Sequence, residues 1–215
     1  MSLLNLALDV SSNQDPHLID GAAIVGAGVN RLLARASDGV EWEDAAFAAH
    51  QAWARKLDLE RGAYHFLRVR HQRAQDSEEQ AREFVRIYQR EQCTFFPAVD
   101  CERLPPTMTG ETAIEHDAST QEERRTAIRD WCRFTMGEVG KALVYGSPDY
   151  LEPIGLTEED LFGAQLWLAN YASTGGAHPI PGATPPWAEW TGWQWTGSGA
   201  IAGLKGNADL SYFRE

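Results

Sequence analysis

Short apolar runs alternate with longer amphipathic segments along the chain as far as Tyr150. Residues 3–10 are near-continuously apolar, as is typical of a β-strand buried on both faces. Further runs of this kind predict strands at residues 31–36, 63–67, 94–101 and 141–145. Because each strand is followed by a helical pattern, the sequence predicts five β/α units and a parallel sheet with right-handed crossovers.

The segments between these strands carry helix signals. Asp15 before Pro16 is typical of an N-cap followed by proline in the first turn. Residues 41–57 show a helical pattern with apolar positions at Trp42, Ala45, Ala49, Ala52 and Trp53. Two capping boxes, Ser77-x-x-Gln80 and Ser119-x-x-Glu122, predict the starts of two more helices. Their buried faces are predicted to contain Ala81, Phe84, Val85 and Tyr88, and Ala127, Ile128, Trp131 and Phe134.

After Tyr150 the pattern changes. Residues 163–171 predict another strand, residues 172–191 are rich in Gly, Pro and Trp, and short strands follow at 193–196 and 209–213. We expect an α/β fold whose sheet closes into an irregular TIM-like β/α barrel, with about five β/α units and additional C-terminal strands. An open doubly wound sheet is the alternative. The length, without a repeat or linker, predicts a single domain over residues 1–215.

Composition and charge exclude several classes of protein. A formal net charge of −12 and a pI of about 4.9 make the chain a poor electrostatic partner for nucleic acid or an anionic membrane. The apolar start of the chain has no basic region and stops at Asp9, so we expect no signal peptide and synthesis in the cytoplasm. Three cysteines without a C-x-x-C pair predict neither a zinc ribbon nor a disulfide framework.

Polar side chains gather where the predicted strands end. The set comprises Asp9, Tyr64-His65-Phe66, Asp100-Cys101-Glu102, Tyr145, Trp167, Gln194 and Asp209. A sheet of this kind places its chemistry at the carboxyl ends of its strands. The asymmetry therefore favours a functional site at that edge.

The most informative local feature is the pair of carboxylates in Asp100-Cys101-Glu102. Side chains alternate along a strand, so Asp100 and Glu102 project from the same face. Mutual repulsion tends to raise the pKa of one carboxyl. A protonated acid beside an ionised partner is what cleavage of a glycosidic bond requires. Asp9 and Asp209, at the ends of two other predicted strands, strengthen this interpretation.

Two alternatives remain open at this stage. A candidate oxygen-rich metal site consists of Asp9, His65, Asp100 and Glu102. However, His65 alternates with Tyr64 and Phe66 along the strand, so its side chain is expected to face away from the barrel axis. The tryptophans at 187, 190, 193 and 195 fit either core packing under a long loop or a wall on which sugars stack.

Seven short motifs, in order along the chain, resemble those of the glycoside hydrolase family 25 lysozymes, the Chalaropsis-type muramidases. They are Asp9-Val10-Ser11 with Gln14, Ala34-Arg35-Ala36-Ser37-Asp38-Gly39, Gly62-Ala63-Tyr64-His65-Phe66, Pro97-Ala98-Val99-Asp100-Cys101-Glu102, Leu166-Trp167-Leu168-Ala169-Asn170-Tyr171, Trp193-Gln194-Trp195, and Asp209-Leu210-Ser211-Tyr212-Phe213. The resemblance extends over essentially the whole chain and includes phage endolysins and bacterial enzymes.

The resemblance implies hydrolysis of the β-1,4 bond between N-acetylmuramic acid and N-acetylglucosamine in bacterial peptidoglycan, without metal or cofactor. By motif, Glu102 is the implied general acid, and Asp100 assists the N-acetyl group of the substrate or acts directly. Asp9 and Asp209 complete an acidic floor. Tyr64, Tyr145, Trp167 and Gln194 resemble substrate contacts. A catalytically inactive glycan-binding barrel and a metal-dependent deacetylase are the alternatives.

The chain also departs from the family pattern. Arg35 stands where the family often has Lys, and Trp195 where many members have Tyr. Many relatives carry a separate wall-binding module, for which we expect no room here. We expect a monomer that reaches the cell wall by holin-type release or dedicated export.

Overall fold

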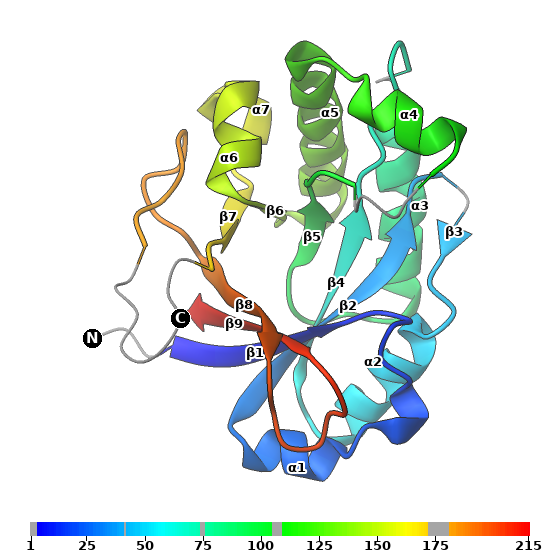
Figure 1. Cartoon of the computed structure of the whole chain (residues 1–215), viewed down its shortest axis with the longest axis vertical. Coiled ribbons are helices and arrows are strands. Elements are labelled where there is room, and N and C mark those ends of the chain that lie inside the picture. Colours follow the sequence, from blue (N-terminus) through cyan, green and yellow to red (C-terminus); the bar gives the residue numbers. More distant parts are fainter. Residues whose placement is uncertain (1–3, 41, 74–75, 105–108, 172–180) are drawn as a thin grey trace.

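The chain forms an irregular TIM-like barrel in the computed structural model, which describes residues 4–40, 42–73, 76–104, 109–171 and 181–215 (Figure 1). The barrel strands within these ranges are β1 (Leu4–Val10), β2 (Val29–Asp38), β4 (Glu60–Phe66), β5 (Pro97–Asp100), β6 (Leu143–Gly146), β7 (Gln165–Ala169), β8 (Gly192–Gly199) and β9 (Ala208–Arg214). A short strand, β3 (Trp42–Glu43), extends the sheet beyond β2.

Closure of the barrel depends on the two edges of β1. One edge of β1 pairs in parallel with β2, and the other pairs antiparallel with β9. Parallel pairing continues from β2 through β4, β5, β6 and β7 to β8, and β9 then returns antiparallel to β8. The predicted closed barrel is thus confirmed, and the open doubly wound sheet is wrong because β9 joins both ends of the sheet.

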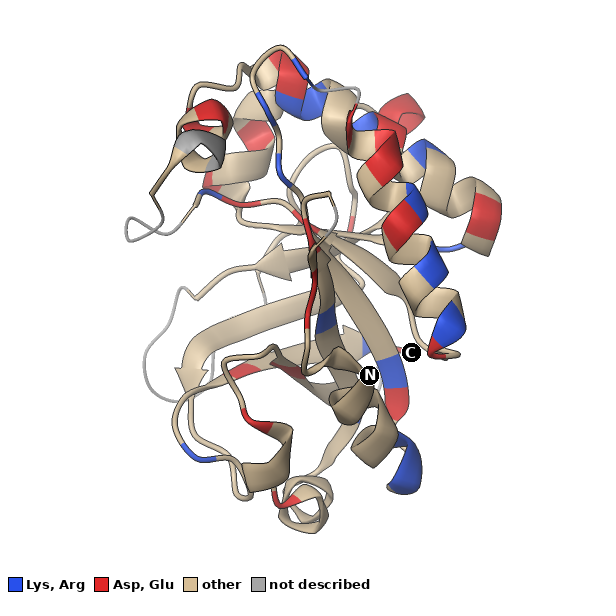
Figure 2. Cartoon of the chain, turned by 90° about the vertical axis from the view of Figure 1, so that its right-hand side faces the viewer, with Lys and Arg blue, Asp and Glu red and all other residues tan. Residues whose placement is uncertain are grey.

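Helices cover the outside of the barrel. They are α1 (Gly21–Gly26), α2 (Phe47–Lys56), α3 (Asp76–Arg90), α4 (Glu111–Asp117), α5 (Gln121–Val139), α6 (Pro148–Leu151) and α7 (Glu158–Leu161), with 3-10 turns η1 (Pro16–Leu18) and η2 (Glu152–Ile154). Along α3 and α5, acidic and basic residues are interspersed (Figure 2). Among the described residues, no helix is both long and apolar enough to cross a membrane.

Some helix starts differ from those that the sequence predicts. Trp42 lies in β3, not in the helix predicted at 41–57, because α2 begins only at Phe47. The capping box of α5 is Thr120 with Glu123, one residue beyond the predicted pair. Helix α3 begins before Ser77, and the Gln80 side chain bonds to neighbouring loops rather than to the helix start.

Side chains form two hydrophobic layers separated by the barrel wall. The inner layer contains small residues beside large rings, and its buried members are Ala7, Leu33, Phe95, Ala98, Leu143, Tyr145, Trp167, Ala169 and Phe213. The outer layer packs the strands against the helices and includes the predicted faces of α3 and α5, with Phe134 only partly buried. Because side chains fill the interior, a ligand site is expected at an end of the barrel and not inside it.

Gly192 is a position where this packing leaves no room for a side chain. A Cβ there would lie 2.3 Å from the ring of Phe213. We expect Gly192→Ala to lower the free energy of unfolding by about 1–3 kcal/mol through overpacking. Gly137→Ala on α5, where a Cβ meets nothing within 4 Å, should leave stability unchanged or raised. Urea unfolding of both variants tests this, and equal stability of Gly192→Ala and wild type would contradict it.

Candidate functional site

The carboxyl ends of the parallel strands surround a cleft of about 270 Å³. All eight site residues predicted from the sequence line it: Asp9, Tyr64, Asp100, Glu102, Tyr145, Trp167, Gln194 and Asp209. The structure therefore brings together residues from β1, β4, β5, β6, β7, β8 and β9, and from the chain just after β5.

Strand alternation explains why these side chains meet. Ala7 and Ala98 point into the barrel core, so residues two positions later, Asp9 and Asp100, point along the same face into the cleft. On β9, which runs in the opposite direction, Phe213 fills the core and Asp209 reaches the cleft. The pattern that packs the core thus also delivers the carboxyl groups.

Asp9, which is buried, and Asp209, which is half-buried, form an acidic pair. They are directly opposite residues in the antiparallel pairing of β1 with β9. Burial and the neighbouring Asp209 carboxyl hold the pKa of Asp9 well above its usual range. Burial also raises the pKa of the less enclosed Asp209. The pair therefore favours sharing a proton over carrying two negative charges.

Gln194 holds Asp9 in place. Its amide nitrogen donates to the two carboxylate oxygens of Asp9 at 3.3 and 3.1 Å. Its amide oxygen accepts hydrogen bonds from the hydroxyl groups of Tyr145, at 2.7 Å, and Tyr171. Because these contacts use both ends of the amide, Gln194 orients the acidic floor as well as lining the cleft.

Asp100 and Glu102 form the second acidic pair. Burial, together with the neighbouring Glu102 and Asp9 carboxyls, raises the pKa of Asp100. Its Oδ1 atom is buried and has no hydrogen-bond partner among the described residues. Burial and the Asp209 carboxyl raise the pKa of Glu102 to about 7. Glu102 therefore retains its proton over much of the acidic to neutral range.

The backbone that carries Glu102 is held by His116 of α4. The Val69 N–H donates to His116 Nδ1 at 3.2 Å, which leaves the ring proton on Nε2. Nε2 then donates to the carbonyl oxygen of Glu102, also at 3.2 Å. Burial lowers the pKa of His116 to about 4, so the ring stays neutral and keeps both bonds near neutral pH.

Two of the predicted substrate contacts, Trp167 and Tyr145, are too buried to offer a ring face to a sugar. Trp167 is only 2% exposed, and its indole N–H donates to Ser211 Oγ at 3.0 Å. Tyr145 is 7% exposed and lies against Trp167, with ring centroids 4.7 Å apart. Tyr171, which the sequence analysis gave no role, is 52% exposed at the cleft. Its place in the Leu166–Tyr171 motif was the available signal.

Arg68 and Asp38 are further cleft residues that the sequence analysis missed. They form a two-bond ion pair, in which Arg68 Nη2 lies 2.6 Å from Asp38 Oδ2. The backbone of Arg68 is held in turn by both ends of the Gln80 amide, at 3.0 and 2.8 Å. This ion pair adds one positive and one negative group to the lining of the cleft.

The metal interpretation that included His65 is wrong. Its Nε2 donates to Gln80 Oε1 at 3.0 Å, and its Nδ1 accepts from Ser37 Oγ at 2.9 Å. Both ring nitrogens are thus engaged outside the barrel, as strand alternation requires. Burial lowers the pKa of this ring to about 4.

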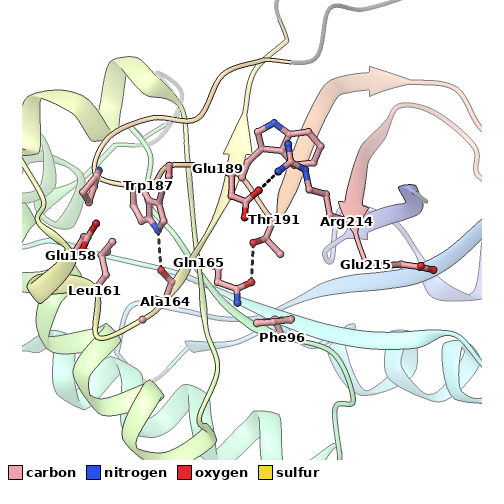
Figure 3. Close-up of a pocket in the computed structure, with 14 residues that line it drawn as sticks. Phe96, Glu158, Leu161, Ala164, Gln165, Trp187, Glu189, Thr191, Arg214 and Glu215 are labelled. Atoms are coloured by element: carbon pink, nitrogen blue, oxygen red, sulfur yellow. Dashed lines mark hydrogen bonds and ion pairs between the residues drawn. The ribbon is translucent and has the colours of Figure 1, made fainter. Parts of the chain in front are cut away.

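The sugar-stacking interpretation of the tryptophan cluster is also wrong for the cleft. Trp190 and Trp193 are buried, and none of Trp187, Trp190, Trp193 and Trp195 lines the acidic cleft. Trp187 and Trp190 instead border a larger cavity of about 990 Å³ at the amino ends of the strands (Figure 3). There Arg214 lies over the Trp190 ring and pairs with Glu189 at 2.6 Å.

Comparisons with known proteins match most of the chain to one family. The sequence profile described as "Glycosyl hydrolases family 25" matches residues 8–204. Lysozyme M1 of Streptomyces globisporus is 25% identical over 211 residues, which cover 96% of this chain and 66% of that protein. The autolytic lysozyme of Clostridium acetobutylicum is 25% identical over 209 residues, 97% of this chain and 55% of that protein.

The fold is also similar to a solved structure. A GH25 lysozyme from Aspergillus fumigatus superposes with a TM-score of 0.76 at 22% identity, covering 99% of this chain and 95% of that one. Against the curated relatives, the chain spans 66% and 55% of their lengths.

The raised pKa of Glu102 predicts that the ionised carboxylate destabilises the folded protein at high pH. A carboxyl whose folded pKa lies above its unfolded value stabilises the protein at low pH, and this contribution is lost as pH rises through about 7. We therefore expect Glu102→Gln to be more stable than wild type at pH 8 by about 1–3 kcal/mol, or roughly 2–10 °C in Tm, with little difference at pH 4.

Thermal unfolding between pH 4 and 8 measures this difference. Glu138→Gln, which removes an exposed charge on α5, is the control and should show no such dependence on pH. A difference between Glu102→Gln and wild type that stays constant with pH would contradict the prediction.

Proposed function

Because the chain belongs to glycosyl hydrolase family 25, we propose that it is a lysozyme that hydrolyses the β-1,4 bond between N-acetylmuramic acid and N-acetylglucosamine in peptidoglycan. The observation that carries the proposal is the pairing of two unlike carboxyls in one cleft. Glu102 has a pKa of about 7 and is therefore protonated below that pH. Asp100 has a buried Oδ1 atom without a hydrogen-bond partner among the described residues. The protein is a glycoside hydrolase by family, and these residues supply the acid and the stabilising group.

In the proposed reaction, Glu102 protonates the glycosidic oxygen as the bond from that oxygen to C1 of the muramic acid breaks. The acetamido oxygen of the same sugar forms a bond to C1, and Asp100 accepts the acetamido N–H through its unpartnered oxygen. Water then attacks C1, the bond from C1 to the acetamido oxygen breaks and restores the acetamido group, and the water gives a proton to the Glu102 carboxylate, which restores the starting acid. Direct participation of Asp100 at C1 is the alternative course.

Asp9 and Asp209 are proposed to keep the pKa values of the neighbouring carboxyls raised. Asp209 raises the pKa of Glu102, and Asp9 shares the floor of the cleft with Asp100. Since peptidoglycan lies outside the cytoplasmic membrane, we propose that the protein acts there after holin-type release or dedicated export.

Replacing the acid should remove cleavage without unfolding the protein. We expect Glu102→Gln to lower kcat by about 10²–10⁴-fold or more, because an amide cannot protonate the leaving oxygen. Mass spectrometry of digested peptidoglycan, with borohydride labelling of the new reducing ends, measures this. Labelled muramic acid ends with wild type and none with Glu102→Gln are expected. Equal yields from both proteins would refute the assignment of the acid.

The pH profile should report the proton on Glu102. We expect kcat/KM to fall tenfold per pH unit above an apparent pKa near 7, where the general acid loses its proton. Asp209→Asn removes a charge that raises this pKa, so the alkaline limb should move to lower pH. Initial rates on soluble glycan oligomers from pH 5 to 9 test both statements. Glu138→Gln should leave the limb in place, and an unmoved limb in Asp209→Asn would contradict the proposed coupling.

A further inference from the structure

An exposed tryptophan, Trp42, lines a groove beside the acidic cleft and is not one of the residues that line the cleft itself. Trp42 belongs to β3, which pairs antiparallel with the carboxyl end of β2 through Asp38. The side chain is 44% exposed, which is unusual for indole in a folded chain. The strand pairing therefore fixes a large apolar ring at the same edge of the barrel as the carboxyl groups.

Trp42 is held from one side by a rigid cation. The Arg35 guanidinium carbon lies 5.0 Å from the centroid of the indole ring. Arg35 Nε donates to Asp44 Oδ2 at 2.9 Å, and Nη2 donates to Ser12 Oγ at 2.9 Å. Asp44 is itself buried and accepts the Ser12 and Ala46 backbone N–H groups. The ring is thus positioned before any ligand arrives, which lowers the entropic cost of binding.

A groove of about 470 Å³ lies against this ring. Its lining includes Arg35, Asp38, Val40, Trp42, Arg68 and Arg70. Arg35, Asp38 and Arg68 also line the acidic cleft, so the groove and the cleft share a wall. A linear polymer that crosses the cleft can therefore continue into the groove.

The chemistry of the groove favours an uncharged sugar over an anion. Each of its arginines already has a carboxylate partner: Arg35 pairs with Asp44, Arg68 with Asp38, and Arg70 with Asp76 and Glu115 at 3.9 Å. An indole face with nearby guanidinium and carboxylate groups matches the apolar C–H face and the hydroxyl rim of a pyranose ring.

We propose that Trp42 and this groove form a distal glycan subsite, which binds a sugar ring of the same strand at least one residue away from the bond that is cleaved. The inference rests on the proposed function, because it assigns the groove to the same polymer. Binding energy gained at such a distance helps to hold the reacting sugar in place on Glu102 and Asp100.

The test compares glycan length in a protein that cannot cleave. In a Glu102→Gln background, titration calorimetry measures the affinity for peptidoglycan-derived tetrasaccharide and octasaccharide. We expect the octasaccharide to bind more tightly, and Trp42→Ala to weaken octasaccharide binding about tenfold while tetrasaccharide binding stays within about twofold. Trp42→Phe should retain most of the gain with length.

Phe162→Ala is the matched control, because Phe162 is 46% exposed and lines neither the cleft nor the groove. It should leave both affinities unchanged, and thermal unfolding confirms that all variants fold. A Trp42→Ala protein that keeps the full gain with length, or loses both affinities equally, overturns the subsite.

Cleavage by the wild type is scored separately, through the labelled muramic acid ends. Their absence refutes the proposed function, whereas their presence together with no gain from glycan length refutes only the subsite.

Discussion

The antiparallel pairing of β9 with β1 is the constraint on which the site depends. It closes the barrel, and its register places Asp209 directly opposite Asp9. Two carboxyls in this position repel each other, and burial strengthens the repulsion because little water remains to screen it. The site responds by keeping protons: the pKa values of Asp9, Asp100 and Glu102 are all raised. The returning strand therefore closes the sheet and supplies the Asp209 carboxyl, which adds to burial in raising the pKa of Glu102.

Such a cluster needs support from outside the barrel, and three buried histidines of the described chain provide part of it. His50 donates to the Ser11 carbonyl while its Nδ1 accepts the indole N–H of Trp53. His65 donates to Gln80, whose amide holds the Arg68 backbone. His116 joins Val69 to the Glu102 carbonyl. Each ring is neutral with one donor and one acceptor nitrogen in use. His50 and His116 tie loops at the cleft to α2 and α4, and His65 ties the barrel wall to α3. Lysine, which has donors but no acceptor, cannot replace that combination.

The closed barrel and the acidic residues were predictable because both follow from strand periodicity. Alternation places Asp100 and Glu102 on one face, and the same rule turns His65 outward. Details set by tertiary contacts were not predictable. β3 has only two residues, too few to show a period, so Trp42 was assigned to a helix. The start of α5 shifted by one residue because Thr120 and Ser119 are both competent caps. The burial of Trp190 and Trp193 depends on tertiary packing that the sequence does not specify, and Tyr171, although part of a motif, is placed at the site by its contact with Gln194.

Burial raises the pKa values of the acids and lowers those of the histidines. Together these opposite shifts set a lower and an upper pH limit for the site. Neutral His65 and His116 contribute stability above their unfolded pKa of 6.5, and that contribution is lost as pH falls toward about 4. The raised carboxyls contribute stability at low pH, and Glu102 loses its share as pH rises through about 7. Below the lower limit a protonated His116 can no longer accept the Val69 N–H, so the link that His116 makes between Val69 and the Glu102 carbonyl is broken at Val69. Above the upper limit Glu102 is ionised and lacks the proton that the proposed general acid must donate. Between about pH 4 and pH 7 Glu102 is protonated and His116 keeps both of its hydrogen bonds, so the burial that makes the cluster costly also sets the pH interval in which the proposed reaction is expected to run.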